Sequence, residues 1–250
     1  MTSKALTVPA VALGTWAWGD SGEAGDGDDP VADMLEQSLD RFGTDHVDLF
    51  WIHNPADVAR WTPPLIPLLK SGKVKHVGVS NHNLKEIALA DQIFGEAGFR
   101  VEAVQNHYSL LYRSSEHAGI LDHCREHDVP FFAYMVLEQG ALTGRYSPAH
   151  PLPEGSNRAT VYNGILPRLQ ALTDRMGAIG KERGASAAEV AIAWAIAKGT
   201  SPIVGVTKAD HIDGVVRARG IELADEEIAE LEAPADAADV DTRGWWENEM

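Results

Sequence analysis

The sequence predicts an α/β fold in which repeated strand–helix units build a parallel sheet with helices on its outside. Short apolar runs alternate along the chain with segments of helical periodicity, which is the pattern of such a sheet. The runs that begin at Val47, His76, Val101 and Pro130 start about 25 to 30 residues apart, the length of one strand–helix unit. The chain has 250 residues, and a single α/β barrel is typically about 250 residues long.

Six segments are predicted to be strands, and most of them are continuously apolar, as expected for strands buried on both faces. They are Val8–Gly14, Val47–His53, His76–Ser80, Val101–Ser109, Pro130–Met135 and Pro202–Val206. Because a closed barrel of this kind has eight strands, we expect an incomplete barrel of about six strands. No low-complexity linker interrupts the sequence, so we expect a single domain over residues 1–250.

Helices are predicted between the strands. The segment Pro30–Phe42 has Asp28 and Asp29 as capping residues and a proline in its first turn, which is a strong start signal. A capping box of Ser186 and Glu189 begins another helix, which ends at Lys198. Further helices are expected at Pro63–Lys70, Leu84–Gly95 and Glu116–His127, and the longest irregular segment is Gln139–Tyr162.

The composition excludes several classes of partner. The chain has 37 acidic and 21 basic residues and a formal net charge of −16, whereas nucleic acids and anionic membranes attract clustered Lys and Arg. We therefore expect no nucleic-acid partner and no membrane association, and the apolar N-terminal run is too short to span a bilayer. A small anionic ligand stays compatible with this charge, because a local basic pocket can exist in an acidic protein.

The single cysteine, Cys124, rules out an internal disulfide. Its isolation fits a reducing compartment, so we expect a cytoplasmic location. The residue lies in an amphipathic helical pattern, and we interpret it as a buried structural thiol rather than a nucleophile.

Polar and aromatic residues follow four consecutive predicted strands. They are His53, Ser80 with Asn81, Gln105 with Asn106, and Tyr134. Each has a structural explanation when taken alone, such as a helix cap for Ser80 and Asn81. Because α/β barrels place their sites at the carboxyl ends of the strands, the set as a whole favours a ligand site.

At these strand ends the chain resembles the aldo-keto reductases, which are NAD(P)H-dependent carbonyl reductases with a TIM-barrel fold. The matching stretches are LGTW, LEQSLDRFGTDHVDLFWIHNP, LLKSGKVKHVGVSNHN, VEAVQNHYSLL, FFAYMVLEQGALTGRY and AWAIAKGTSPIVGVTKADHI. They occur in the family's order and cover nearly the whole chain. The resemblance implies a small-molecule carbonyl substrate that is reduced to an alcohol.

The resemblance also implies roles for the residues at the strand ends. Ser80, Asn81 and Gln105 match the residues that hold the nicotinamide carboxamide. Tyr134 matches the aromatic residue that stacks on the nicotinamide ring. His53 matches the active-site histidine that orients and polarises the carbonyl group.

The phosphates of the cofactor are assigned by the same resemblance to two later segments. The backbone from Met135 to Gly140, which includes Leu137, matches the segment around the diphosphate. The stretch PIVGVTKADHI matches the adenosine-phosphate site and supplies Gly205, Val206, Lys208 and His211. Lys208 or His211 would meet a 2′-phosphate, which favours NADP, with NAD as the alternative. The family often ends this motif with Glu-Asn, where this chain has Gly214 and Val215.

One part of the family pattern is missing. The family catalyses with an Asp, a Tyr and a Lys beside the histidine. The first two come from a motif close to D-x-A-x-x-Y-G, and the Lys from the end of the third strand. Neither feature occurs at the corresponding place in this chain, where the first strand is followed at once by the helix preceding VDLFWIH. General-acid catalysis is worth about 10²–10⁴-fold, so we expect impaired turnover unless another tyrosine, such as Tyr108 or Tyr112, replaces the lost acid.

The segment GDSGEAGDGDDP, residues 19–30, lies where the missing units would be. Its five acidic residues would repel a phosphate, and its glycines do not have the spacing of a dinucleotide-binding fingerprint. The register of a calcium loop also fails, and we expect no metal site. A plain acidic loop is the simplest interpretation, and the family comparison adds that it marks an internal deletion near residues 19–30.

Loss of two neighbouring strands changes what the sheet can do. We expect a strained six-stranded closure, an open sheet, or a homodimer that covers the exposed strand edges. Trp16 and Trp18 follow the first strand, and Trp245 and Trp246 lie near the C-terminus. Either pair can line a substrate pocket or simply pack against the fold.

Three hypotheses about function are left open. The chain is an aldo-keto reductase with impaired catalysis, a non-catalytic protein that binds a nicotinamide nucleotide or regulates a partner, or a deletion product without a function of its own.

Overall fold

The computed structural model of the protein describes residues 6, 12–14, 29–55, 57–244, 247 and 250. Within them, six parallel strands form one sheet in the order β1-β6-β5-β4-β3-β2. The strands are β1 (Ala12–Gly14), β2 (Val47–Ile52), β3 (Val74–Ser80), β4 (Ala103–His107), β5 (Phe131–Tyr134) and β6 (Ser201–Gly205). Each overlaps a strand predicted from the sequence.

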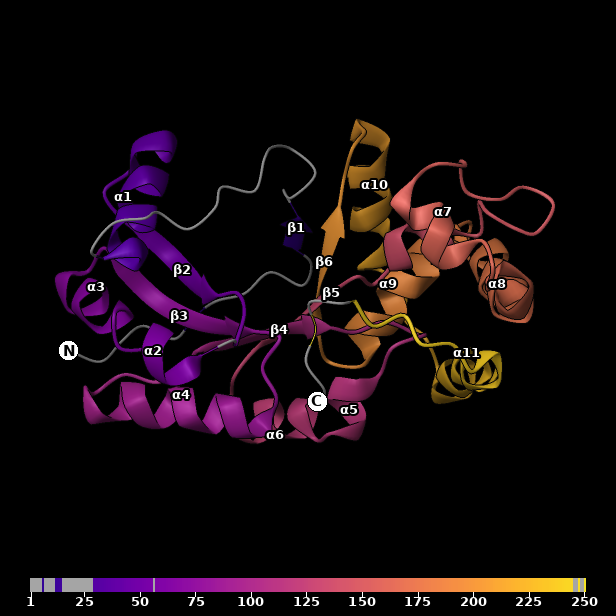
Figure 1. The fold of residues 1–250 in the computed structure, drawn as a ribbon. Coiled ribbons are helices and arrows are strands. Elements are labelled where there is room, and N and C mark those ends of the chain that lie inside the picture. Colours follow the sequence, from indigo (N-terminus) through magenta and orange to yellow (C-terminus); the bar gives the residue numbers. More distant parts are fainter. Residues whose placement is uncertain (1–5, 7–11, 15–28, 56, 245–246, 248–249) are drawn as a thin grey trace.

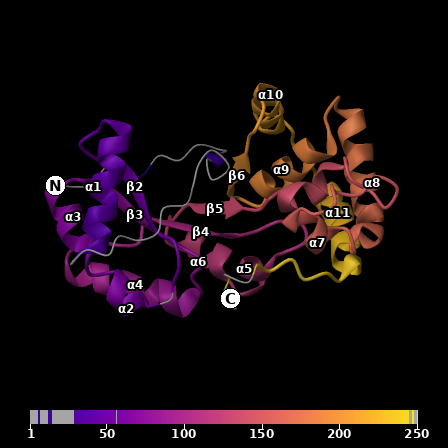
Figure 2. The ribbon, with the colours of Figure 1, turned by 45° about the horizontal axis from the view of Figure 1, so that its top comes forward.

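The sheet is curved and open. Figures 1 and 2 show the strands as a curved row with helices along its outer side. Among the described strands, β1 and β2 are the two edges of the sheet and do not pair with each other. Of the three arrangements expected after the loss of two strands, the described residues adopt the open sheet. The predicted fold class, a parallel sheet derived from a barrel with six strands instead of eight, is confirmed.

The pairing register brings the carboxyl ends of neighbouring strands to the same level. Ser80 at the end of β3 lies opposite Gln105 of β4. Two residues further along β4, His107 lies opposite Tyr134 at the end of β5. Residues far apart in the sequence are therefore neighbours at this edge of the sheet, which lies where α/β barrels place their ligands.

Helices connect the strands. They are α1 (Pro30–Phe42), α2 (Val58–Trp61), α3 (Leu65–Ser71), α4 (Leu84–Glu96), α5 (Ser114–His117), α6 (Ile120–Glu126), the 3₁₀ segment η2 (Glu138–Thr143), α7 (Asn157–Tyr162), α8 (Leu166–Glu182), α9 (Ala187–Ala197), α10 (Ala209–Ala218) and α11 (Asp225–Ala238). The first helix has the predicted bounds. Its Asp29 side chain accepts a hydrogen bond from the Ala32 N–H at 3.1 Å, and Pro30 occupies the first turn.

Two predictions about the connections need correction. The helix expected at Glu116–His127 is split into α5 and α6, because Gly119 between them has φ of 78° and cannot continue a right-handed helix. The segment Gln139–Tyr162 is not irregular throughout, since η2 and α7 occupy its two ends. The capping box of Ser186 and Glu189 is present at the start of α9 as predicted.

The core lies between the sheet and the surrounding helices. Trp194 of α9 is fully buried, and its ring stacks on Tyr108 with centroids 5.1 Å apart. Cys124 of α6 is 3% exposed, and burial raises the pKa of its thiol to about 12. A thiol with such a pKa is not a nucleophile near neutral pH, so the interpretation of Cys124 as a structural residue is confirmed.

Several sequence features lie outside the described residues. They are Trp16 and Trp18, most of the acidic segment 19–30, and Trp245 and Trp246. In the part of the chain that the structure describes, no helix is both long and apolar enough to cross a membrane.

Candidate active site

Three of the predicted site residues meet at the ends of β2 and β3. Asn81 follows β3 in a left-handed conformation with φ of 61° and is 1% exposed. Its amide nitrogen donates to the backbone carbonyl of His53 at 2.9 Å and lies 3.4 Å from the Ser80 hydroxyl. The Asn81 side chain therefore fixes the chain just after β2, where the exposed side chain of His53 begins.

Gln105 and Tyr134 extend this group across β4 and β5. The Ser80 hydroxyl lies 3.4 Å from Gln105 Oε1, at the long end of the hydrogen-bond range. The Tyr134 hydroxyl donates to Asn81 Oδ1. Ser80, Asn81, Gln105 and Tyr134 thus form one hydrogen-bonded row across three neighbouring strands.

The backbone after β5 is unusual. Met135, Glu138 and Gln139 have φ of 60°, 46° and 50°, and Gly140 has φ of 107°. Residues other than glycine occupy this left-handed region only when the surroundings hold them there, at a cost of order 1–3 kcal/mol each. Such a run is typical of a functional segment, and Leu137 is half-buried within it.

A buried carboxylate holds this segment in place. The Glu138 side chain is fully buried and accepts hydrogen bonds from Ser109, Tyr162 at 2.7 Å and Thr242 at 3.1 Å. Its Oε1 also lies 2.9 Å from Nε2 of His107. Because His107 and Ser109 lie at the end of β4, Tyr162 in α7 and Thr242 after α11, Glu138 ties the strained backbone to three separate parts of the chain.

His107 carries the compensating charge. The imidazole is fully buried, with Nε2 facing Glu138 and Nδ1 3.0 Å and 3.1 Å from the two carboxylate oxygens of Glu247. Burial alone would lower the pKa of His107, but the charge and hydrogen bonds of Glu138, together with those of Glu247, outweigh it and raise the pKa to about 9. At neutral pH the residue is therefore an imidazolium ion between two carboxylates.

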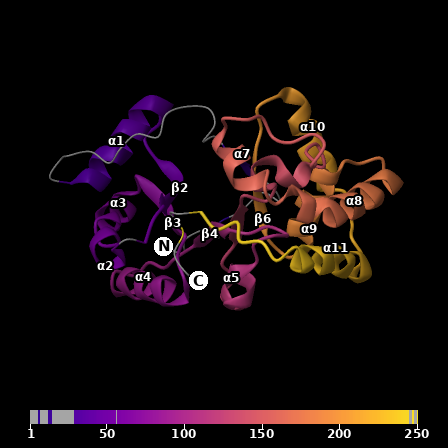
Figure 3. The same cartoon turned by 45° about the vertical axis from the view of Figure 1, so that its right-hand side comes forward.

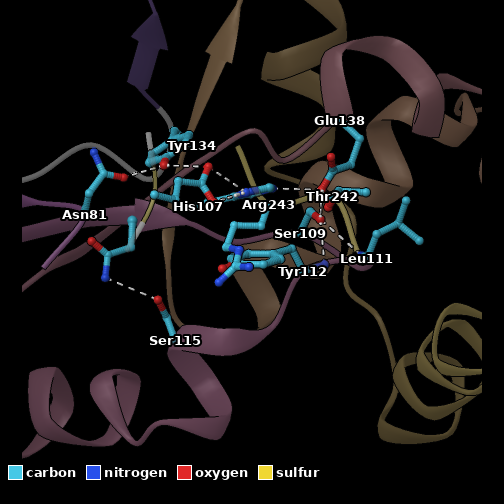
Figure 4. A network of polar contacts seen from close by, with 12 residues as sticks. Asn81, His107, Ser109, Leu111, Tyr112, Ser115, Tyr134, Glu138, Thr242 and Arg243 are labelled. Atoms are coloured by element: carbon cyan, nitrogen blue, oxygen red, sulfur yellow. Dashed lines mark hydrogen bonds and ion pairs between the residues drawn. The ribbon is translucent and has the colours of Figure 1, made fainter. Parts of the chain in front are cut away.

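The same cluster reaches the predicted nicotinamide residues, as Figure 4 shows. Glu247 Oε1 lies 3.0 Å from the Tyr134 hydroxyl. The rings of His107 and Tyr134 stack with centroids 5.6 Å apart and an interplanar angle of 26°. One continuous network therefore runs from Asn81 through Tyr134, Glu247 and His107 to Glu138.

The predicted adenosine-phosphate residues lie at the end of the next strand. Gly205 ends β6 and Val206 is buried after it. Lys208 precedes α10 and His211 lies in its first turn, both with exposed side chains. The Thr207 N–H lies 3.4 Å from His211 Nδ1, which orients that ring at the start of α10.

The two tyrosines that could replace the lost acid, Tyr108 and Tyr112, both contact other residues of the fold. The Tyr108 hydroxyl donates to Glu116 at 2.8 Å, and burial and this carboxylate raise its pKa well above the usual range. The Tyr112 ring stacks on His107 with centroids 4.3 Å apart, and burial raises its pKa as well. Neither hydroxyl has a hydrogen bond to His53 among those described.

Neither of the two described cavities is lined by the predicted site residues. The one of about 550 Å³ lies among η2, α8 and α9, with Thr143, Asp174 and Ser186 in its lining. Within the described residues, no group of three or more His, Cys, Asp or Glu side chains is placed to hold a metal ion.

Sequence reasoning missed His107, Glu138 and Glu247. Two signals were available. His107 shares a strand face with Gln105 because the two are separated by one residue in β4, and Glu138 is an isolated acid in the apolar stretch FFAYMVLEQGAL. No local signal marks Glu247, since it meets His107 across 140 residues of sequence.

Comparison with known proteins identifies the family of the chain. The model of the Aldo/keto reductase family matches residues 21–236. The chain is 32% identical over 206 residues to the chloroplastic pyridoxal reductase of Arabidopsis thaliana, covering 79% of this chain and 55% of that protein. It is 28% identical over 214 residues to the L-glyceraldehyde 3-phosphate reductase of Escherichia coli O157:H7, covering 79% and 61% of the two chains.

A solved structure shows the same fold. The glycerol dehydrogenase of Gluconobacter oxydans superimposes with a TM-score of 0.74 at 24% identity, over 82% of this chain and 63% of that one. The chain thus spans between about half and two thirds of the length of these proteins.

Proposed function

The chain belongs to the aldo/keto reductase family, and we propose that it binds a nicotinamide nucleotide and reduces a small-molecule carbonyl to an alcohol with impaired turnover. Beyond the family membership, we propose the identity of the cofactor, the residues that bind it and the loss of rate. An internal deletion near residues 19–30 is part of the same proposal.

The observation that carries the proposal is the hydrogen-bonded row of Ser80, Asn81, Gln105 and Tyr134. A carboxamide has one acceptor and two donor hydrogens. The hydroxyl of Ser80 and the side-chain amides of Asn81 and Gln105 offer complementary groups along one edge of the sheet. The donor set therefore fits a nicotinamide carboxamide, and the ring of Tyr134 offers it an aromatic surface.

The following segment fits a diphosphate. A negatively charged ligand is disfavoured beside an uncompensated carboxylate, but Glu138 is fully buried and paired with the imidazolium of His107. The charge of His107 thereby offsets that of Glu138, which lessens the repulsion between this side chain and an anion at the backbone of Met135–Gly140.

For the adenosine end, NADP is favoured over NAD. Lys208 and His211 have exposed side chains at the start of α10, where a positive charge and the helix dipole both favour a phosphate. NAD stays the alternative, because Asp210 and Asp213, which lie on either side of His211 in the sequence, reduce the local positive charge.

The reaction would proceed as in a carbonyl reductase that has lost its general acid. A nicotinamide nucleotide held by Ser80, Asn81, Gln105 and Tyr134 would supply the hydride for the carbonyl carbon. His53, exposed at the end of β2, would orient the carbonyl oxygen, and a proton must reach that oxygen. Tyr108 and Tyr112 are held by Glu116 and by the ring of His107, so neither is proposed as the proton donor. Loss of general-acid catalysis predicts a rate about 10²–10⁴-fold below that of a complete site.

Substrate, partners and location are further proposals. The relatives named for pyridoxal and for L-glyceraldehyde 3-phosphate point to small carbonyl compounds as a class. A homodimer covering the free edges of β1 and β2 would satisfy exposed backbone groups, and sedimentation velocity tests it.

The cytoplasmic location expected from the single cysteine is retained as a proposal, although the Arabidopsis relative is named as chloroplastic.

The second candidate is a non-catalytic protein that holds the nucleotide. It is favoured by the occupied tyrosines and by the missing D-x-A-x-x-Y-G motif. The third, a deletion product without function, predicts no nucleotide binding at all.

The experiment is a titration of NADPH followed by tryptophan fluorescence, with reduction of 4-nitrobenzaldehyde assayed in the same sample. Asn81→Gly removes the amide but keeps the left-handed backbone, because glycine adopts positive φ without strain. It should weaken NADPH binding about tenfold, the value of one hydrogen bond to a polar ligand. Asp128→Gly is the matched control, since Asp128 also has positive φ but is exposed in a turn away from the site.

The outcomes separate the candidates. Binding with turnover supports an impaired reductase, and binding without turnover supports the nucleotide-holding protein. Absence of binding by the wild-type chain would refute both.

A further inference from the structure

Glu138 is the point at which the strained segment after β5 is attached to the rest of the fold. Its backbone has φ of 46°, and its side chain is fully buried. The carboxylate accepts hydrogen bonds from Ser109, from Tyr162 at 2.7 Å and from Thr242 at 3.1 Å. Thr242 belongs to the chain after α11, which Figures 1 and 3 show running back toward β4. The place of this one carboxylate therefore sets where the backbone of Met135–Gly140 lies.

His107 supplies the positive charge that this carboxylate faces. Its Nε2 lies 2.9 Å from Oε1 of Glu138, and both side chains are fully buried (Figure 4). The hydroxyl partners of Glu138 donate hydrogen bonds but do not compensate its charge. Because a buried charge without a counter-charge is costly, Glu138 is held in this place most firmly when His107 is protonated.

We propose that His107 and Glu138 are a positioning pair for the diphosphate of the cofactor, in which the protonated imidazole holds the Glu138 carboxylate and thereby keeps the backbone of Met135–Gly140 in the arrangement that accepts an anion. The inference deepens the proposed function and rests on it, because that function places the diphosphate at Met135–Gly140. Its consequence is that nucleotide affinity and the proton on His107 depend on each other.

The direction of this coupling follows from the charges. Loss of the proton from His107 leaves the carboxylate of Glu138 uncompensated, and that negative charge repels an incoming diphosphate. Burial would lower the pKa of His107, but Glu138 and Glu247 together raise it to about 9. Affinity should therefore fall as pH rises through this value. Conversely, a bound diphosphate favours the protonated imidazole, so binding near this pH takes up a proton.

The tyrosine hydroxyls in contact with the pair keep their protons between about pH 7 and about pH 9. Burial raises the pKa of Tyr112, whose ring stacks on His107, and burial together with Glu138 raises the pKa of Tyr162 well above its usual range. The other titratable or charged groups described around the pair are Glu247 at Nδ1 of the imidazole, the stacked Tyr134, and Arg243 and Asp241, whose charges act on the Tyr112 hydroxyl. A proton uptake that disappears in a His107 variant is therefore assigned to this imidazole.

Calorimetry of the wild-type chain measures the coupling without any substitution. NADPH is titrated at about pH 7 and about pH 9 in buffers of different ionisation enthalpy, and the change of heat with buffer gives the number of protons taken up. We expect little uptake at the lower pH and up to about half a proton at the higher one, because free His107 is half protonated there. Adenosine diphosphate ribose with a 2′-phosphate lacks only the nicotinamide, so it should take up the same fraction.

His107→Gln removes the proton and keeps a hydrogen-bonding side chain. It should weaken NADPH binding at about pH 7 by about fivefold or more, the lower end of typical coupling between sites. It should also abolish the uptake at about pH 9, which a purely structural role of His107 would not change. Adding Glu138→Gln removes both charges, so the double variant should regain part of the affinity without regaining the proton uptake.

Two exposed residues provide matched controls. His117→Gln changes the last residue of α5, and Glu230→Gln neutralises a glutamate of α11 that pairs with Arg175. Both should keep the wild-type affinity and proton uptake. Urea unfolding of each variant verifies that the fold is kept, and the wild-type calorimetry decides the matter even if His107→Gln does not fold.

The outcomes separate the positioning pair from the proposed function. Wild-type binding without proton uptake at about pH 9 would overturn the positioning pair alone. So would an uptake that persists in His107→Gln, or one that occurs with NADPH but not with the fragment that lacks nicotinamide. Absence of binding of both nucleotides by the wild-type chain would overturn the proposed function as well.

Discussion

The buried imidazolium of His107 makes stability depend on pH in a specific direction. Its folded-state pKa is raised to about 9, against 6.5 for an unperturbed histidine. Between these two values the folded chain holds one proton more than the unfolded chain. The free energy of unfolding must then fall as pH rises, by about 1.4 kcal/mol per pH unit at most.

The magnitude follows from the size of the shift. A change of 2.5 pKa units, from 6.5 to about 9, corresponds to about 3 kcal/mol. This stabilisation is complete below pH 6.5 and is lost as pH rises through 9.

Urea unfolding at constant ionic strength, from about pH 7 to about pH 8, measures the first part of this loss, below the range in which Cys124 and the tyrosines ionise in the unfolded chain. His107→Gln removes the titrating group and should flatten the dependence, although it lowers stability overall. His211→Gln is the matched control, since His211 is exposed at the start of α10, and it should keep the wild-type slope. A wild-type free energy that is constant over this range, or a slope that survives in His107→Gln, would refute the reasoning.

Three other predictions concern the core. Gly78→Ala should destabilise the chain by about 1–3 kcal/mol in urea, because a new Cβ would overlap the ring of Trp51; an unchanged midpoint would show that the ring is free to move. Trp194→Ala should cost about 3–5 kcal/mol in thermal unfolding, since the side chain is fully buried, and a loss below about 1 kcal/mol would contradict its place in the core. Cys124 should react with a disulfide reagent only after unfolding, because burial raises its pKa to about 12; rapid reaction of the native chain would be evidence against its burial.

The sequence predicted the strands, and the structure decided how they are arranged in the sheet. The continuous apolar runs predicted six strands, and each overlaps one that is described. The sequence left three arrangements open for the strands on either side of residues 19–30. The open sheet depends on how β1 and β2 lie in space, since β1 pairs with β6 and β2 pairs only with β3 among the described strands.

In the candidate site, the residues were predictable from the sequence but their hydrogen-bond partners were not. Ser80, Asn81, Gln105 and Tyr134 were predictable because each follows or ends an apolar run, and parallel strands bring such ends to one edge. The roles of these residues still rest on the family resemblance and on the proposed experiments. That the Asn81 amide donates to the backbone of His53 was not predictable, because hydrogen-bond partners across strands depend on register.

By itself the sequence determined the elements of this protein. Asp29 with Pro30, the capping box of Ser186 and Glu189, and the β-branched runs act through neighbours a few residues away, so local composition is enough to reveal them. Only the tertiary structure decided that His107 lies between Glu138, 31 residues away, and Glu247, 140 residues away. Periodicity records which side of an element is buried, but it does not record which distant charge meets it there. The burial that raises the pKa of His107 and seats Glu247 beside Tyr134 therefore exists only in the folded chain.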